Sequence, residues 1–227
     1  MAHAQTVRAR VLAIDPNARS YTLEAQPTPL QAAVGPGDAQ VPYTGHWIEA
    51  QMLKTNEGLR LEAIWPADPQ MLSIMAQLNN ELRRDTVARG SKVFRAQGEF
   101  MPRFAQFDNN GALFTQDSLM GKYTVLNFIF TRCQNPVMCP ASTQRMADLQ
   151  KRLREAGFME KTQLVSISLD PSYDTPGILT QYILSQGIDG THHRFLTGPK
   201  SALEDLKKQL GVLTQFADNT IDHTMAT

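Results

Sequence analysis

Hydrophobic and polar positions follow two different rhythms along the chain. In residues 6–66, short segments alternate apolar and polar positions, as in TVRARVLAI, where every second residue from Val7 to Ala13 is apolar. This segment and RSYTLEA, HWIEAQML and LRLEAIW are separated by turn-rich stretches, a pattern typical of strands. Residues 27–45 are rich in Pro and Gly and are interpreted as loop. The pattern therefore predicts a small all-β, barrel-like domain of four or five strands over residues 6–66.

After Pro66, the spacing of apolar residues becomes that of a helix. Leu72, Met75, Leu78 and Leu82 recur at spacings of three and four residues, which predicts a helix that ends near Gly90. Residues 67–97 are interpreted as a linking helix and linker, which either joins the barrel to the C-terminal part of the chain or packs between the two parts.

Strands and helices alternate over residues 98–227. The runs YTVLNFIF (123–130) and QLVSISLD (163–170) are nearly all apolar, which is typical of strands buried on both faces. Helices are predicted for ASTQRMADLQKRLREAG, PGILTQYILSQG and PKSALEDLKKQLG, which follow or begin with Pro and end at Gly. This order favours a partly parallel sheet in an α/β domain.

Charge and length exclude several classes of partner. The 227 residues carry 22 basic and 22 acidic side chains, so neither nucleic acid nor an anionic membrane surface is an expected partner. No apolar stretch reaches the roughly 18 residues that a membrane span needs. Ala2-His3-Ala4, before Gln5, has the small-x-small form of a signal-peptidase site. We therefore expect a periplasmic or other extracytoplasmic location, with a membrane anchor as an option in the full-length precursor.

The two cysteines, Cys133 and Cys139, offer the main candidate chemistry. Cys133 follows a predicted buried strand, and Cys139 precedes Pro140 at the start of a predicted helix. A helix N-terminus favours thiolate over thiol, so we expect a lowered pKa for Cys139. From the residues alone, the pair fits a structural disulfide, a redox pair or two arms of a metal site.

A set of segments in residues 98–227 forms a recognisable pattern: FDNNGALF, GKYTVLNFIFTRC, CP at 139–140, SISLDPSYDTP at 166–176, LTG at 196–198, LGV at 210–212 and DHT at 222–224. Together these segments resemble the Sco/SenC family of copper chaperones for cytochrome c oxidase assembly. The resemblance covers roughly residues 98–227 and implies a thioredoxin-like domain there. It further implies copper, chiefly Cu(I) with Cu(II) as the second state, held by Cys133, Cys139 and His223. Soft Cu(I) prefers thiolate ligands, and Asp222 is expected to orient the imidazole. The implied partner is a copper-receiving protein such as a cytochrome oxidase subunit.

The chain departs from the family pattern at two places. Five residues, QNPVM, separate the cysteines, where the family usually has three. The family fold also continues past the histidine into a further strand or hairpin and a last helix, whereas residues 224–227 alone follow here. Either the chain is truncated, or a neighbouring chain supplies the missing edge and forms a dimer there.

The alternative function is that of an enzyme, a thiol–disulfide oxidoreductase with Cys133 and Cys139 as its catalytic redox pair. Ordinary thioredoxins place a cis-proline opposite their cysteines, but no proline follows Pro199, which favours metal. The remaining candidates have structural interpretations: Met138 packs beside the cysteines, His192 and His193 lie in a loop, Asp174 caps a helix, and His46, Trp47 and Met52 are core or interface residues.

Overall fold

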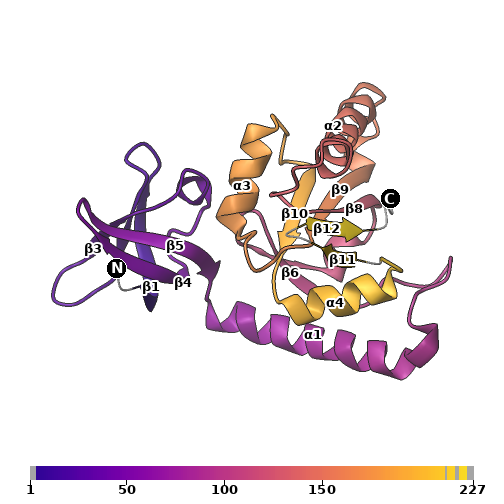
Figure 1. Cartoon of the computed structure of the whole chain (residues 1–227), viewed down its shortest axis with the longest axis horizontal. Coiled ribbons are helices and arrows are strands. Elements are labelled where there is room, and N and C mark those ends of the chain that lie inside the picture. Colours follow the sequence, from indigo (N-terminus) through magenta and orange to yellow (C-terminus); the bar gives the residue numbers. More distant parts are fainter. Residues whose placement is uncertain (1–3, 213, 218–219, 224–227) are drawn as a thin grey trace.

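The computed structural model describes the backbone of residues 4–212, 214–217 and 220–223, and the side chains up to Val212 except that of Lys92. A small barrel lies beside a larger α/β domain, and one long helix runs from the barrel along the underside of that domain (Figure 1).

The first domain is a closed barrel with strand order β1-β2-β3-β5-β4. The strands are β1 (Gln5–Asp15), β2 (Ser20–Leu23), β3 (Leu30–Ala33), β4 (Trp47–Thr55) and β5 (Gly58–Pro66). Neighbouring strands are antiparallel except for β3 and β5, which pair in parallel at Ala33 and Arg60. The barrel interior is filled by Val11, Tyr21, Ile48 and Leu61, among others. The prediction of a small β-barrel is confirmed.

Two details of the barrel differ from the sequence prediction. Residues 27–45 are not all loop, because they contain β3 and a short 3-10 helix, η1 (Asp38–Gln40). Ala13 does not share the inward face of Val11, because the β1–β2 register shifts between them and Ala13 is exposed. Such a bulge moves the next side chains to the other face, and Ile14 packs against the core instead.

The second domain is built on a five-stranded sheet of order β7-β6-β10-β9-β8. The strands are β6 (Ala105–Asp108), β7 (Leu113–Thr115), β8 (Tyr123–Ile129), β9 (Thr162–Ser168) and β10 (His193–Thr197). Strands β8, β9 and β10 are parallel, and β6 is antiparallel to β10 and β7, so the predicted partly parallel sheet is confirmed. A separate hairpin pairs β11 (Thr214–Ala217) with β12 (Thr220–His223).

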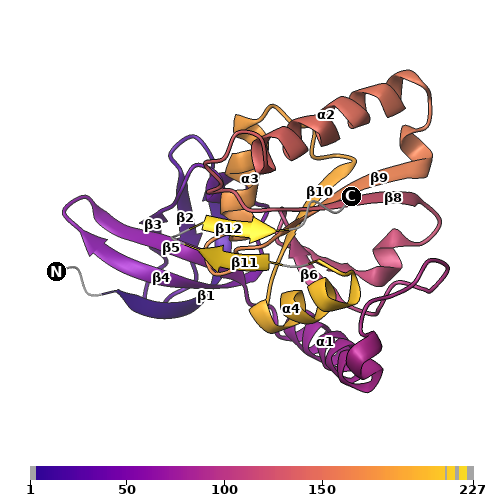
Figure 2. The ribbon, with the colours of Figure 1, turned by 45° about the vertical axis from the view of Figure 1, so that its right-hand side comes forward.

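Helices cover both faces of this sheet. They are α1 (Pro69–Arg89), α2 (Cys139–Glu155), α3 (Pro176–Ser185) and α4 (Lys200–Gln209). Short 3-10 turns follow α1 (η2, Gly90–Lys92), separate β7 from β8 (η3, Gln116–Leu119) and separate α2 from β9 (η4, Met159–Lys161). Helices α2 and α3 lie on one side of the sheet, and α1 and α4 on the other (Figures 1 and 2). Among the described helices, none combines the length and apolar character needed to cross a bilayer.

Strand β8 is less buried than its composition predicts. Tyr123 is 77% exposed, and only the last three residues of the strand are fully buried, whereas β9 is buried along its whole length. The difference follows from position, because β8 is the edge strand and β9 lies inside the sheet. The prediction of burial on both faces is therefore correct for β9 and wrong for the first half of β8.

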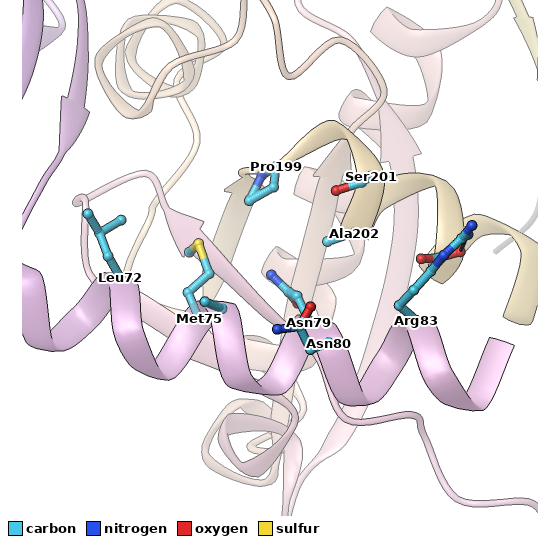
Figure 3. Close-up of a pocket in the computed structure, with 10 residues that line it drawn as sticks. Leu72, Met75, Asn79, Asn80, Arg83, Pro199, Ser201 and Ala202 are labelled. Atoms are coloured by element: carbon cyan, nitrogen blue, oxygen red, sulfur yellow. Dashed lines mark hydrogen bonds and ion pairs between the residues drawn. The ribbon is translucent and has the colours of Figure 1, made fainter. Parts of the chain in front are cut away.

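Helix α1 packs closely against the second domain. The Asn79 side chain donates to the Ala105 carbonyl at 3.0 Å and accepts from the Ala105 amide at 2.9 Å, which fixes the helix to β6. Arg83 pairs with Asp205 of α4 at 2.9 Å. Between α1 and the start of α4 lies a groove of about 370 Å³, lined by apolar and amide side chains, Ser201 and the Arg83–Asp205 ion pair (Figure 3). Leu72 borders this groove and is 37% exposed, so the apolar stripe of α1 is only partly buried.

The barrel touches the second domain through η1, which lies against α3. A Cβ atom on Gly177 of α3 would lie 1.9 Å from Asp38 Oδ1, and one on Gly37 would lie 1.9 Å from the Gly177 carbonyl oxygen. Distances this short leave no room for a side chain at either glycine. The approach of η1 to α3 therefore depends on glycine at both positions.

Candidate functional site

The two cysteines meet between β8 and α2. Strand β8 ends at Ile129, Cys133 lies in the following loop, and Cys139 is the first residue of α2. They are not joined by a disulfide, and their thiols are hydrogen-bonded to each other. Cys139 is only 1% exposed, whereas Cys133 is half-buried with its sulfur 3.8 Å from the Asn135 carbonyl oxygen. The five-residue spacing thus brings two soft sulfur donors together, one facing inward and one partly outward.

The expected low pKa of Cys139 is wrong for this structure. The pKa of Cys139 is raised to about 12. Burial is the largest cause and the neighbouring Cys133 thiol adds to the rise, while backbone hydrogen bonds at Phe130 and at Cys139 itself act in the opposite direction. The favourable field of a helix N-terminus does not compensate for the loss of water around a nearly fully buried sulfur. Cys139 is therefore a thiol at neutral pH in this state.

The loop before Cys133 is tied to the turn after β9. The Asp174 carboxylate accepts hydrogen bonds from the Thr131 amide at 3.3 Å, from the Thr131 hydroxyl and from the Ser168 hydroxyl at 2.5 Å. Asp174 is fully buried, and this burial raises its pKa although the hydrogen bonds oppose the rise. The expectation that Asp174 caps α3 is wrong, because Thr175 is the cap and accepts from the Ile178 amide at 3.3 Å.

A second link between the same two segments lies at the surface. The Arg132 guanidinium binds Asp170, with Nε 3.0 Å from Oδ2, and lies 4.2 Å above the Tyr173 ring. The segments TRC and LDPSYDTP are therefore one structural unit around the cysteines. The sequence indicated these segments only through the family resemblance and their places at strand ends, and it did not show the contacts between them.

Polar contacts also support the first turn of α2. Asn127 of β8 donates to Ser142 at 2.9 Å and accepts from Ser166 of β9 at 2.6 Å. Ser166 in turn contacts His193 Nε2 at 2.7 Å. The interpretation of His193 as a loop residue is wrong: it begins β10, is fully buried, and has its pKa lowered by burial to about 4. His193 is thus a neutral structural residue, and His192 beside it lies 3.8 Å from Glu160.

The third expected ligand, the imidazole of His223, lies outside the described side chains. His223 is the last residue of β12 and its backbone pairs with Thr214, and the Asp222 carboxylate likewise lies outside the described side chains. Within the described residues, no three His, Cys, Asp or Glu side chains gather as a metal site. Met138 is half-buried directly before α2.

The barrel candidates lie apart from the cysteine loop. His46 Nδ1 pairs with Asp68 at 2.9 Å with 53% of the side chain exposed, so of the two expected places, core or interface, the core is excluded for His46. Trp47 lies beneath the Arg8 guanidinium, 5.9 Å from the ring centroid. Met52 packs against the barrel core, as expected.

Comparison with known proteins places this site in a family. A sequence model described as SCO1/SenC matches residues 93–227, which is more than half of the chain. The chain belongs to the SCO1/SenC family. The match includes both cysteines and the whole second domain from β6 onward, whereas the barrel and α1 precede it.

Individual SCO1/SenC relatives agree with this assignment. The "Putative copper-binding protein" of Stutzerimonas stutzeri is 35% identical over 114 residues, which cover 49% of this chain and 52% of that protein. The "SCO1 protein homolog" of Bacillus subtilis is 32% identical over 91 residues, which cover 40% of this chain and 45% of that protein. The chain therefore spans about half the length of these curated relatives.

A solved structure supports the fold of the second domain. The crystal structure of a SCO1/SenC family lipoprotein from Bacillus anthracis matches with a TM-score of 0.52 and 30% identity, covering 58% of this chain and 78% of that one. The mixed sheet with helices on both faces is thus the thioredoxin-like fold of this family.

Proposed function

We propose that this protein is a Sco/SenC-type metallochaperone that carries Cu(I) and delivers it to a copper protein such as a cytochrome c oxidase subunit. The observation that carries the proposal is the contact between two unoxidised thiols at the start of α2 in a SCO1/SenC chain. The name of the Stutzerimonas stutzeri relative, which refers to copper binding, supports it.

The donor set suits Cu(I) as cargo. Cys133 and Cys139 supply two soft sulfurs, which Cu(I) prefers over oxygen or nitrogen ligands, and both sulfurs lose their protons as the metal binds. We assign the third ligand to the imidazole of His223, and the orientation of that imidazole to Asp222. Two thiolates and a neutral imidazole leave one net negative charge around Cu(I), which favours retention of the cation.

Metal binding by the reduced protein tests the proposal. In competition with a Cu(I) chelator, the wild-type protein is expected to bind one Cu(I), and Cys133→Ser and Cys139→Ser are expected to abolish binding. His223→Ala should weaken binding while leaving disulfide formation intact, and His46→Ala, at a half-exposed histidine of the barrel, serves as its control. Failure of the reduced wild-type protein to retain Cu(I) would refute the metallochaperone assignment.

The second candidate is a thiol–disulfide oxidoreductase that reduces the cysteines of the copper-receiving protein. It uses the same sulfurs, and the partial exposure of Cys133 favours it, because a partner disulfide needs access to one thiol. The two activities exclude each other at any moment, since oxidised cysteines cannot bind Cu(I) as a dithiolate. Unchanged copper affinity in His223→Ala, together with rapid reduction of a protein disulfide, would favour this candidate.

Location and association belong to the same proposal. We place the protein outside the cytoplasm, which agrees with the description of the Bacillus anthracis relative as a lipoprotein; fractionation of cells that express the precursor tests this. We further propose that two copies associate through the C-terminal edge, and sedimentation equilibrium should then give the mass of a dimer.

A further inference from the structure

The first turn of α2 is attached to the rest of the domain at two polar points close to Cys139. Ser142 receives a hydrogen bond from Asn127 of β8, and the Thr143 hydroxyl lies 2.9 Å from the Tyr182 hydroxyl of α3. Side chains three and four residues after Cys139 lie on its face of the helix and lean back toward its turn. Both attachments therefore act on the turn that carries the buried sulfur.

Tyr182 links this turn to α3 and lies within electrostatic reach of the cysteines. Its ring packs edge-on against Phe195, with centroids 6.1 Å apart, and it borders the same hydrophobic cluster as Cys133 and Cys139. Burial raises the pKa of Tyr182, the bond to Thr143 opposes the rise, and both cysteine thiols add to it. The phenol is thus close enough to respond to charge on the sulfurs.

Helix α3 is itself held in place on other sides. The Thr180 hydroxyl donates to the Asn109 carbonyl at 2.6 Å, and Gly177 lies directly under Asp38 of the barrel. Tyr182 is therefore presented by a helix that is also held at points away from the cysteine loop. A hydrogen bond from a fixed helix restrains the position of its partner on α2.

We propose that Tyr182 is a positioning residue for the cysteine pair, whose hydroxyl bond to Thr143 fixes the first turn of α2 and thereby the separation of Cys139 from Cys133. The inference deepens the proposed function, because a two-sulfur site for copper requires a fixed separation. Without the phenol oxygen, the buried Thr143 hydroxyl loses its partner and the turn loses one of its polar attachments. Groups that orient metal ligands commonly change metal affinity by about 10–100-fold when removed.

Hydroxyl deletions on both sides of the bond test the proposal. Tyr182→Phe and Thr143→Val should each weaken Cu(I) binding by about tenfold, and the double variant should be no weaker than either single variant. Thr143→Ser keeps the hydroxyl and should bind copper like the wild-type protein. Tyr123→Phe, at the exposed start of β8, is the matched control and should change nothing.

A second measurement separates positioning from stability and from the copper assignment. The equilibrium constant for forming the Cys133–Cys139 disulfide with glutathione should fall several-fold in Tyr182→Phe, because a looser turn lowers the effective concentration of one sulfur at the other. If both this constant and Cu(I) affinity stay within twofold of wild type while only urea stability falls, Tyr182 is merely structural. If the wild-type protein binds no Cu(I), the proposed function fails, and the glutathione equilibrium still decides the role of Tyr182.

Discussion

Gly177→Ala is the sharpest test of how the barrel is attached to the second domain. The added Cβ would lie 1.9 Å from Asp38 Oδ1, 2.5 Å from its Cγ and 3.0 Å from its Cα. The carboxylate can rotate away, but the Cα belongs to the backbone of η1, so relief of the overlap moves the barrel surface away from α3. The expected result is loss of the close packing between the two domains.

The magnitude follows from two opposing effects. Alanine stabilises a helix over glycine by about 1 kcal/mol in its interior, and by less in the first turn, where Gly177 lies. Overpacking of a close contact costs about 1–3 kcal/mol, and an overlap as deep as this one belongs at the upper end. We therefore expect a net loss of about 2 kcal/mol in the free energy of unfolding.

Urea unfolding followed by two probes provides the assay. Trp47 and Trp65 both lie in barrel strands, and Trp65 also packs against Phe107 of β6. Their fluorescence therefore reports on the barrel and its junction with the second domain, whereas far-ultraviolet circular dichroism is dominated by the helices. In Gly177→Ala the fluorescence midpoint should fall and the two curves should separate, because the domains no longer unfold together. Adding Asp38→Ala should recover only part of the loss, because the contact with the Asp38 Cα atom remains. A Gly177→Ala protein with an unchanged or higher midpoint and coincident curves would show that η1 does not rest on α3.

Three further predictions concern the second domain. In the reduced protein, an alkylating reagent should modify Cys133 much faster than Cys139, because only Cys133 is partly exposed; mass spectrometry of timed samples measures this, and equal rates would contradict the burial of Cys139. The pKa of His193 is about 4 in the folded protein, whereas its ordinary value is 6.5. The stability that the buried neutral imidazole contributes is therefore complete above pH 6.5 and is lost as the pH falls toward 4. By pH 4 the wild-type protein should have lost about 3 kcal/mol more than His193→Gln in urea titrations, and parallel pH profiles would refute this. Asp174→Asn should lower the free energy of unfolding by about 1.5–3 kcal/mol, because the amide nitrogen cannot accept the hydrogen bonds that the carboxylate receives. An unchanged free energy of unfolding would show that these hydrogen bonds do not stabilise the fold.

Periodicity predicted the architecture well, but not the place of each strand in the sheet. Helix α1 was recognisable because its apolar residues recur at helical spacing and it ends at Gly90. Strand β8 looked like β9 in composition, and only the strand order shows that β8 is the edge strand and that β9 lies inside the sheet. The bulge after Val11 was equally invisible, because a register shift depends on the partner strand.

The candidate site was predictable in chemistry and only partly in environment. The positions of Cys133 and Cys139 at a strand end and a helix start indicated a reactive pair, and the structure places their thiols in contact. The pKa of Cys139 was mispredicted because the helix N-terminus is evident in the sequence, whereas the burial of the sulfur depends on distant residues. The same reason hid Asp174 and Tyr182, whose partners lie 43 and 39 residues away in the chain.

The unequal exposure of the two sulfurs sets the order in which they bind and release a ligand. Whatever approaches from solvent, whether a metal donor or an oxidised partner, meets Cys133 first, since Cys139 lies behind it. A singly attached species on Cys133 therefore precedes any doubly attached one, and release runs in the reverse order. Under the proposed function, Cys139 would therefore release Cu(I) before Cys133 transfers it to the recipient protein.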